Sequence, residues 1–147
     1  MRLLLDAMCG GVRAHLRMCG HDAAYALDRG VEADDELLRI ARAEDRRIVT
    51  RDHDLAARAD DALLLTDRQT EGQLRELAAA GVSLELAAEP ARCGRCNGPV
   101  AAIADDEATP EYAPDPAETE VWRCRDCGGC FWKGSHWDDV RETLSGL

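Results

Sequence analysis

Two pairs of cysteines in the last third of the chain have the spacing of a zinc site. Cys93 and Cys96 form one CxxC pair, and Cys124 and Cys127 form the second. Each pair places two thiolates one tight turn apart, and four such sulfurs complete the tetrahedral shell that Zn²⁺ prefers. We therefore predict a structural zinc ion bound by these four cysteines.

A third cysteine spacing leaves the ligand set open. Cys130 follows Cys127 at CxxC spacing, and His136 lies a short distance beyond it. We favour Cys124 and Cys127 because this pair mirrors the first one and leaves Gly128 at the knuckle, where a residue must turn without steric cost. Cys130 or His136 as the fourth ligand is the alternative.

Aspartates in the N-terminal half follow short apolar segments that are typical of buried strands. Asp6 follows one such run, Asp52 and Asp54 follow another, and Asp34 opens a helix between them. In an open parallel sheet the ligand site lies beyond the carboxyl ends of the strands. Clustered carboxylates repel one another unless a hard cation such as Mg²⁺ or Mn²⁺ neutralises them. Such a site can activate water and position a phosphodiester.

Each aspartate also has a purely structural interpretation. Asp34 could be the N-cap of its helix, and Asp35 competes with it for a role in the site. Asp52 and Asp54 could form turns by bonding to their own backbone. Asp6 is harder to explain in this way, because a carboxylate that directly follows three leucines needs a partner.

Arginines near the first strand could bind the substrate. Arg13 and Arg17 are four residues apart, which places them on one face of the predicted helix near Asp6. Arg51 lies beside Asp52. We expect these side chains to hold a phosphate, and a solvated helix face is the alternative. Cys9 lies among apolar residues, so we expect it to pack as a small hydrophobic side chain.

All three tryptophans lie in the C-terminal part of the chain. Together with Lys133 they could stack on unpaired bases. A small zinc module has few other residues to bury, so we expect at least two of Trp122, Trp132 and Trp137 to form its core and its seam with the first domain.

Strand and helix patterns alternate through the first part of the chain, which indicates an α/β fold with a mostly parallel sheet covered by helices. Strands are predicted at residues 2–6, 23–27, 47–50, 62–65 and 82–86, and helices at 12–19, from 34 onward, and at 73–80. The periodicity fades after Glu89-Pro90. We therefore predict a first domain at 1–88 and a zinc module at 89–147.

The composition limits the class of protein. The 147 residues carry a net charge of -11 and a single lysine, Lys133. An acidic, lysine-poor surface suits a salt-loving cytoplasm, and a GC-rich genome is an equally good explanation. It argues against a protein that simply coats nucleic acid, but it does not exclude a phosphate-bearing substrate. Seven cysteines, an odd number, exclude a complete disulfide framework, and the CxxC spacing indicates a reducing compartment. We expect no signal peptide and no membrane segment.

Several motifs together resemble the Mut-seven C-terminal ribonuclease family. They are Leu5-Asp6-Ala7-Met8, Leu16 to Asp22, Asp34-Asp35-Glu36-Leu37-Leu38, Arg47 to Asp52, and Cys124 to Trp137. The resemblance covers nearly the whole chain. It implies a PIN-like fold, meaning a short parallel sheet flanked by helices, followed by a zinc ribbon. It also implies an acidic site that binds a divalent metal for RNA cleavage.

Carried over position by position, the resemblance makes Asp6, Asp34 and Asp52 the acidic core and Asp54 a helper. The register of the family selects Asp34 over Asp35. The chain departs from the family at Cys19 and Cys130, where larger apolar residues are usual, and we interpret both as packing changes.

Two functions from different classes follow. The first is a metal-dependent endoribonuclease that cleaves single-stranded RNA, in which Arg13, Arg17 or Arg51 steadies the phosphate and the zinc ribbon helps to hold the strand. The second is a non-catalytic adaptor that binds RNA or protein through the ribbon. A DNA nuclease would differ from the first only in its substrate. The RNA target and the oligomeric state are left open.

Overall fold

The computed structural model describes all residues from 1 to 147. Its N-terminal part contains a four-stranded sheet in the order β2-β1-β3-β4. The strands are β1 (Arg2–Leu5), β2 (Asp22–Tyr25), β3 (Arg47–Thr50) and β4 (Leu63–Leu64). All neighbouring strands are parallel, so their carboxyl ends share one edge of the sheet.

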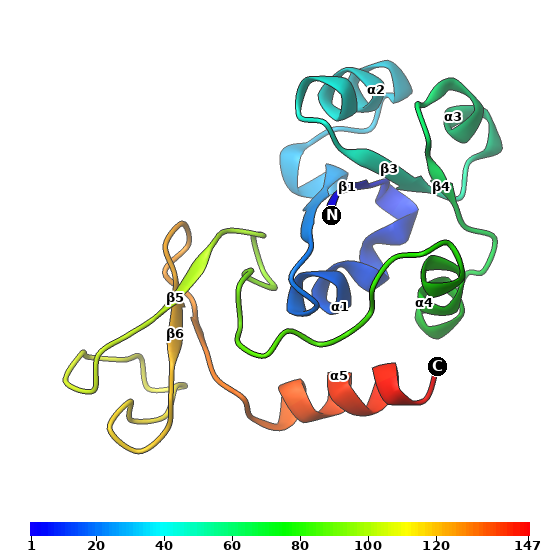
Figure 1. Cartoon of the computed structure of the whole chain (residues 1–147). Coiled ribbons are helices and arrows are strands. Elements are labelled where there is room, and N and C mark those ends of the chain that lie inside the picture. Colours follow the sequence, from blue (N-terminus) through cyan, green and yellow to red (C-terminus); the bar gives the residue numbers. More distant parts are fainter.

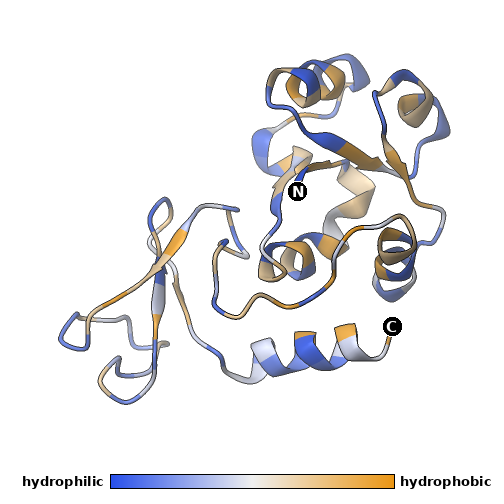
Figure 2. Ribbon diagram, viewed as in Figure 1, coloured by the Kyte–Doolittle hydropathy of each residue, from blue (hydrophilic) through white to orange (hydrophobic).

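Helices cover both faces of this sheet. On one face lie the 3-10 helix η1 (Ala7–Val12) and helices α1 (Arg13–Met18) and α4 (Thr70–Ala79), and on the other lie α2 (Asp34–Ala43) and α3 (His53–Arg58) (Figure 1). A sheet covered on both faces needs strands that are apolar throughout, because successive side chains point to opposite sides. Figure 2 shows this hydrophobic character along the central strands.

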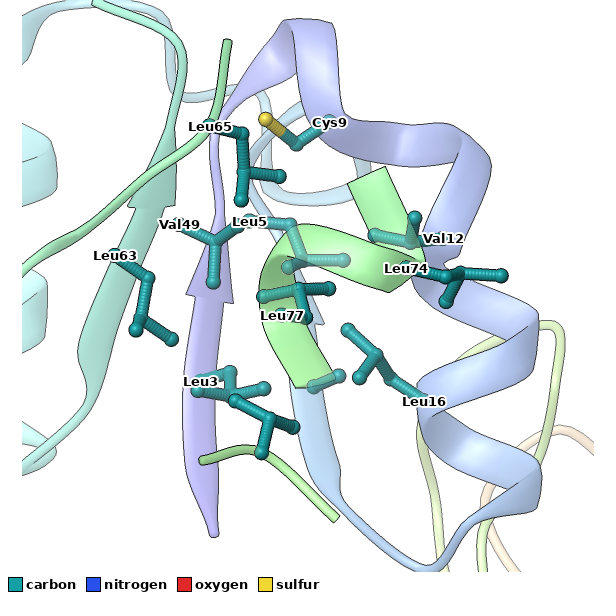
Figure 3. Packing of buried hydrophobic residues seen from close by; sticks show 12 residues of the cluster. Leu3, Leu5, Cys9, Val12, Leu16, Val49, Leu63, Leu65, Leu74 and Leu77 are labelled. Carbon is teal, nitrogen blue, oxygen red and sulfur yellow. The ribbon is translucent and has the colours of Figure 1, made fainter. Parts of the chain in front are cut away.

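The run of leucines in β1 illustrates this division of the core. Leu3 and Leu5 enter a cluster with residues of η1, α1 and α4, as shown in Figure 3. Leu4 points the other way and packs in the cluster that α2 and α3 complete. Both clusters are almost fully shielded from solvent, so β1 lies at the centre of the fold. Asp6, which directly follows β1, therefore has a fixed position at the carboxyl edge of the sheet.

The C-terminal part begins with a small antiparallel sheet. Its strands are β5 (Val100–Ala102), β6 (Trp122–Cys124) and β7 (Cys130–Phe131), in that order. The chain then returns as helix α5 (Ser135–Ser145), which lies beside α1 and α4 in Figure 1. Leu144 of α5 packs against the core cluster that contains β1. None of the helices is both long and apolar enough to cross a membrane.

The α/β architecture with a short parallel sheet and a zinc-ribbon-like module is confirmed. One predicted strand is wrong, because residues 82–86 form no strand. This segment instead crosses over the end of α1, where Ser83 O contacts His21 Nε2 at 2.6 Å and Ala87 N donates to Met18 O at 3.1 Å. The backbone of this segment therefore makes isolated hydrogen bonds to α1 and to the turn that follows it, and it lacks the repeated pairing of a strand.

Candidate active site and metal centre

Asp6 is fixed at the carboxyl edge of the sheet. Its backbone N–H continues the strand pairing by donating to Val49 O at 3.0 Å. Its Oδ1 accepts from the N–H of Ala7 at 2.7 Å and caps η1, while Oδ2 accepts from the hydroxyl of Thr50 at 2.8 Å. The carboxylate is thus held between the ends of β1 and β3 and is only partly buried.

The hydroxyl of Thr50 joins Asp6 to the segment that contains Asp52. Thr50 is fully buried, and its Oγ1 accepts from the N–H of Asp52 at 3.0 Å while it donates to Asp6. Asp52 caps helix α3 through Oδ1, which accepts from the N–H groups of Asp54 and Leu55. Its Oδ2 accepts no hydrogen bond. The structural role suggested by the sequence is therefore present, but it occupies only one of the two carboxylate oxygens.

The remaining predicted acids lie around this pair. Asp34 is partly buried in the first turn of α2, whose N-cap is Ala33, so Asp34 is not the cap. Asp35 is exposed and pairs with Arg58 at the end of α3. Asp54 is exposed in the first turn of α3. No three acidic side chains bring their oxygens within 4.8 Å of one another, so the predicted set of Asp6, Asp34 and Asp52 is not a closed cluster here.

Two further residues at this edge were not found by sequence reasoning. Glu76 of α4 accepts hydrogen bonds from the N–H groups of Thr66 and Asp67, which follow β4. Burial opposes its ionised form, but the hydrogen bond from the hydroxyl of Thr66, together with those from the two N–H groups, lowers the pKa of Glu76. Tyr25, the last residue of β2, donates its hydroxyl to Ala7 O at 2.8 Å, next to Asp6. A glutamate on a helix and a tyrosine at a strand end have no distinctive spacing, so only the fold locates them.

Cys9 packs in the interior beside the acidic edge, as the sequence predicts. Burial raises the pKa of its thiol to about 12, and the negative charge of Asp6 adds to the effect. The thiol is therefore neutral near pH 7. It contributes packing to the core cluster and is not poised as a nucleophile.

Two of the three predicted arginines lie close to this edge. Arg13 donates to Gly10 O at 2.7 Å, and its guanidinium lies 5.0 Å from the centre of the Tyr25 ring. Arg51 directly follows Thr50, and its Nε is buried without a hydrogen-bond partner. A buried donor without a partner costs free energy, so an acceptor that reached this nitrogen would be stabilised.

Arg17 has a different position from the surface cation that the sequence suggested. Its side chain is 1% exposed, and it donates to Ala23 O at 2.9 Å and to Gly94 O at 2.8 Å. Its charge faces Asp28 at 3.8 Å. Arg17 therefore links β2 to the first cysteine knuckle, and it is not accessible to a phosphate at the surface.

The four cysteines of the two predicted pairs converge. Their sulfurs all lie within 4.8 Å of one another, with Cys93 Sγ 3.6 Å from Cys127 Sγ and Cys96 Sγ 3.5 Å from Cys124 Sγ. A tetrahedral site with Zn–S bonds of about 2.3 Å places its sulfurs about 3.8 Å apart. The cysteines are therefore close enough to bind a metal such as zinc.

The backbone supports the same assignment. N–H groups of the knuckles point at the sulfurs of Cys93, Cys96 and Cys124 at 3.4 to 3.5 Å. Such contacts favour the thiolate, which is the form that binds zinc. Cys130 and His136 are not in the group of converging ligand atoms.

Replacing Cys124 by serine should release the metal, whereas the matched Cys130→Ser change should retain it. Cys130 is buried outside the cluster, so its variant tests the loss of a cysteine from the ribbon core without the loss of a ligand. Elemental analysis should find about one zinc per chain in the wild type and in Cys130→Ser. The reverse result would show that the ligand register is wrong.

Together these features define an α/β protein with a parallel sheet that ends in acidic residues and a small four-cysteine module at its side. A model of the Mut7-C RNAse domain family matches residues 1–144, so the chain belongs to this family. The family description indicates an RNA-related role as a ribonuclease-type hydrolase. No curated protein and no solved structure matches the chain significantly.

Proposed function

We propose that this protein is a metal-dependent endoribonuclease that cleaves single-stranded RNA at the carboxyl edge of its parallel sheet. The observation that carries the proposal is the linkage of Asp6 and Asp52 through the buried hydroxyl of Thr50. Thr50 thereby orients the carboxylate of Asp6 and holds the backbone of Asp52 beside it, while the carboxylate of Asp52 is positioned by the N–H groups of α3.

The donor set at this edge fits Mg²⁺ or Mn²⁺. Both ions prefer oxygen ligands, and Mg²⁺ usually binds through only one or two carboxylates and retains several waters. Oδ2 of Asp52 is free of hydrogen bonds, and each oxygen of Asp6 accepts a single one and keeps a second lone pair. Asp6 and Asp52 would therefore hold the ion, without requiring a third direct ligand.

The other acids add negative charge around this pair. We assign Asp34 and Asp54 supporting roles, because they lie in the first turns of α2 and α3. Their charge raises the attraction of the edge for a cation.

The bound ion would supply an activated water and would neutralise charge on the phosphodiester. The chain's own residues position the reactants. Thr50 fixes the orientation of Asp6, and Arg13 and Arg51 provide the cations that a phosphate must meet on a protein with a net charge of -11. We propose that the guanidinium of Arg51, a residue that is only partly buried, donates to a phosphate oxygen.

An adaptor without catalysis is the second candidate. The absence of a closed acidic trio and the capping role of Asp52 favour it. In that case the edge would bind no divalent ion, and the ribbon would make the contacts.

Manganese binding separates the two functions. With zinc in the ribbon, the wild type should bind one further Mn²⁺, as measured by electron paramagnetic resonance, and Asp52→Asn should weaken this binding at least tenfold. Asparagine is as good an N-cap as aspartate, so the substitution removes charge while helix α3 keeps its cap. Asp139→Asn, which removes an exposed charge from α5, is the matched control. Equal manganese affinity in the wild type and Asp52→Asn would favour the adaptor.

A further inference from the structure

Two aromatic side chains of the ribbon, Tyr112 and Trp132, lie outside its buried core. Trp122 in β6 and Trp137 in α5 are 3% and 4% exposed, so two of the three tryptophans are buried. Trp132 follows β7 and is only partly buried. It stacks with Tyr112, which is 52% exposed, with ring centres 6.2 Å apart and planes inclined by 29°. An exposed aromatic pair of this kind is unusual on so polar a surface.

Tyr112 is held in place from two sides. The backbone N–H of Cys130 donates to its hydroxyl at 3.0 Å. The guanidinium of Arg95, within the first cysteine knuckle, lies 6.0 Å from the centre of its ring. The zinc module therefore orders a ring from the long acidic loop against the face that contains Trp132.

A cavity of about 230 Å³ opens at this aromatic pair. Its lining combines Arg95, Tyr112 and Trp132 with Ser135 and His136 at the start of α5. Flat aromatic walls, a planar cation and hydrogen-bonding groups together match the chemistry of a nucleobase.

Arg95 also connects this cavity to the sheet domain. It lines a second hollow of about 390 Å³ together with Arg29 and Tyr25. Tyr25 ends β2 and bonds to Ala7, next to Asp6. Two hollows that share Arg95 therefore lie between the ribbon and the end of β2, and Asp28 also lines the second of them.

We propose that the cavity lined by Tyr112, Trp132 and His136 binds an unpaired nucleobase of an RNA strand that runs past Arg95 towards Asp6. The inference rests on the proposed function, because its occupant is the substrate of that activity. The ribbon would hold the RNA at this cavity, and the contact would be base stacking.

The charge distribution indicates why stacking must dominate. The loop that contains Tyr112 is rich in carboxylates between residues 105 and 120, and it repels phosphates. Contacts with base faces do not depend on charge, and they tolerate any sequence. The stacking contribution should therefore depend only weakly on salt, whereas phosphate contacts with Arg95 and Arg29 should weaken as salt rises.

The test uses the full zinc-loaded chain with Asp6→Asn, which prevents cleavage if the proposed nuclease exists. Binding of an oligoadenylate RNA is measured by fluorescence anisotropy and by quenching of tryptophan emission, and is compared with an abasic ribose-phosphate oligomer of the same length. We expect quenching and tighter binding only with bases. Tyr112→Ala should weaken oligoadenylate binding about tenfold. Tyr112→Phe, which keeps the ring but loses the hydroxyl, should bind nearly as well as the parent.

Equal affinity for the abasic and base-bearing oligomers would overturn the proposal, as would unchanged binding by Tyr112→Ala with its zinc retained. A complete lack of RNA binding would also overturn it and would favour a protein partner for the aromatic pair. Cleavage by the chain with native Asp6 is measured separately in Mn²⁺. Binding that depends on Tyr112 without any cleavage would reject the nuclease alone, and cleavage with binding that does not depend on Tyr112 would reject this site alone.

Discussion

Replacing Asp6 by asparagine should abolish RNA cleavage while the protein stays folded. Asparagine keeps the shape of the side chain and one oxygen that can accept from Ala7 or Thr50, but it loses the charge that would hold the metal. A catalytic ion contributes several kcal/mol to transition-state stabilisation. Since about 1.4 kcal/mol corresponds to a factor of ten in rate, we expect a loss of about a thousandfold or more. The free energy of unfolding should change by only about 1 kcal/mol, the value of a single hydrogen bond.

The measurement compares wild type, Asp6→Asn and Asp139→Asn on a single-stranded RNA with Mg²⁺ or Mn²⁺. Asp139 is exposed on α5, so its variant has the same net charge as Asp6→Asn but an intact edge. The assays are run at low and at molar salt with folding checked by circular dichroism, because carboxylate repulsion on an acidic chain grows as salt falls. Equal RNA loss in all three proteins would indicate a contaminating nuclease. No cleavage by wild type with either metal would reject the proposed activity.

Replacing Asp22 by alanine should lower the free energy of unfolding more than any of the other substitutions proposed here. This residue is 8% exposed and accepts hydrogen bonds from Arg2, Arg46 and Asn97, with Arg92 at 3.6 Å. The side chain of Arg46 is only 6% exposed, so the substitution leaves a largely buried charge without one of its partners. Breaking such a pair costs about 3 kcal/mol. Urea unfolding should show this decrease.

The matched control is Asp60→Ala. Asp60 pairs with Arg42, but both side chains are mostly exposed. Exposed ion pairs contribute about 0–1 kcal/mol, so this variant should unfold close to the wild type. Equal losses in Asp22→Ala and Asp60→Ala would contradict the central role of Asp22.

The effect of Asp22 should also depend on pH. Burial by itself raises the pKa of this carboxyl, but hydrogen bonds from Arg46 and Asn97 dominate and lower it. Because the folded pKa is below the unfolded value of about 3.9, the stabilisation is present above about pH 4 and is lost as the pH falls through the folded pKa. The stability difference between wild type and Asp22→Ala should therefore shrink in acid. Protonation of the four cysteines in acid would release a bound metal from both proteins alike. A constant difference down to about pH 2 would contradict this assignment.

Asp22 matters for the site because it joins the two parts of the molecule. Asn97, just after the first cysteine pair, donates to Asp22 and accepts from the N–H of Ala23 in β2. Arg17 makes a second connection between Ala23 and Gly94. The ribbon is thus attached to the edge strand of the sheet by buried polar contacts. This attachment keeps Arg95 beside the end of β2, as the proposed RNA path requires.

The sequence by itself determined the features that depend on short spacings. Cys93, Cys96, Cys124 and Cys127 could be assigned because a CxxC turn sets the separation of two sulfurs locally. The position of Asp6 could also be inferred from local sequence. The apolar run before it predicts a buried strand that ends at this carboxylate, and parallel strands end at one shared edge of the sheet. Alternation of strands and helices was sufficient for the fold class.

Tertiary structure alone decided the roles that depend on residues distant in the chain. Arg17 has the spacing of a surface cation, but it is buried and donates to Ala23 in β2 and to Gly94 in the first cysteine knuckle. Tyr112 lies in an acidic loop without periodicity, and its stacking on Trp132 follows from a hydrogen bond to the backbone of Cys130. Such contacts join segments whose relative positions are set by the whole core and by the zinc knuckles. No local sequence pattern predicts these contacts, because they form only when distant segments have come together in the folded chain.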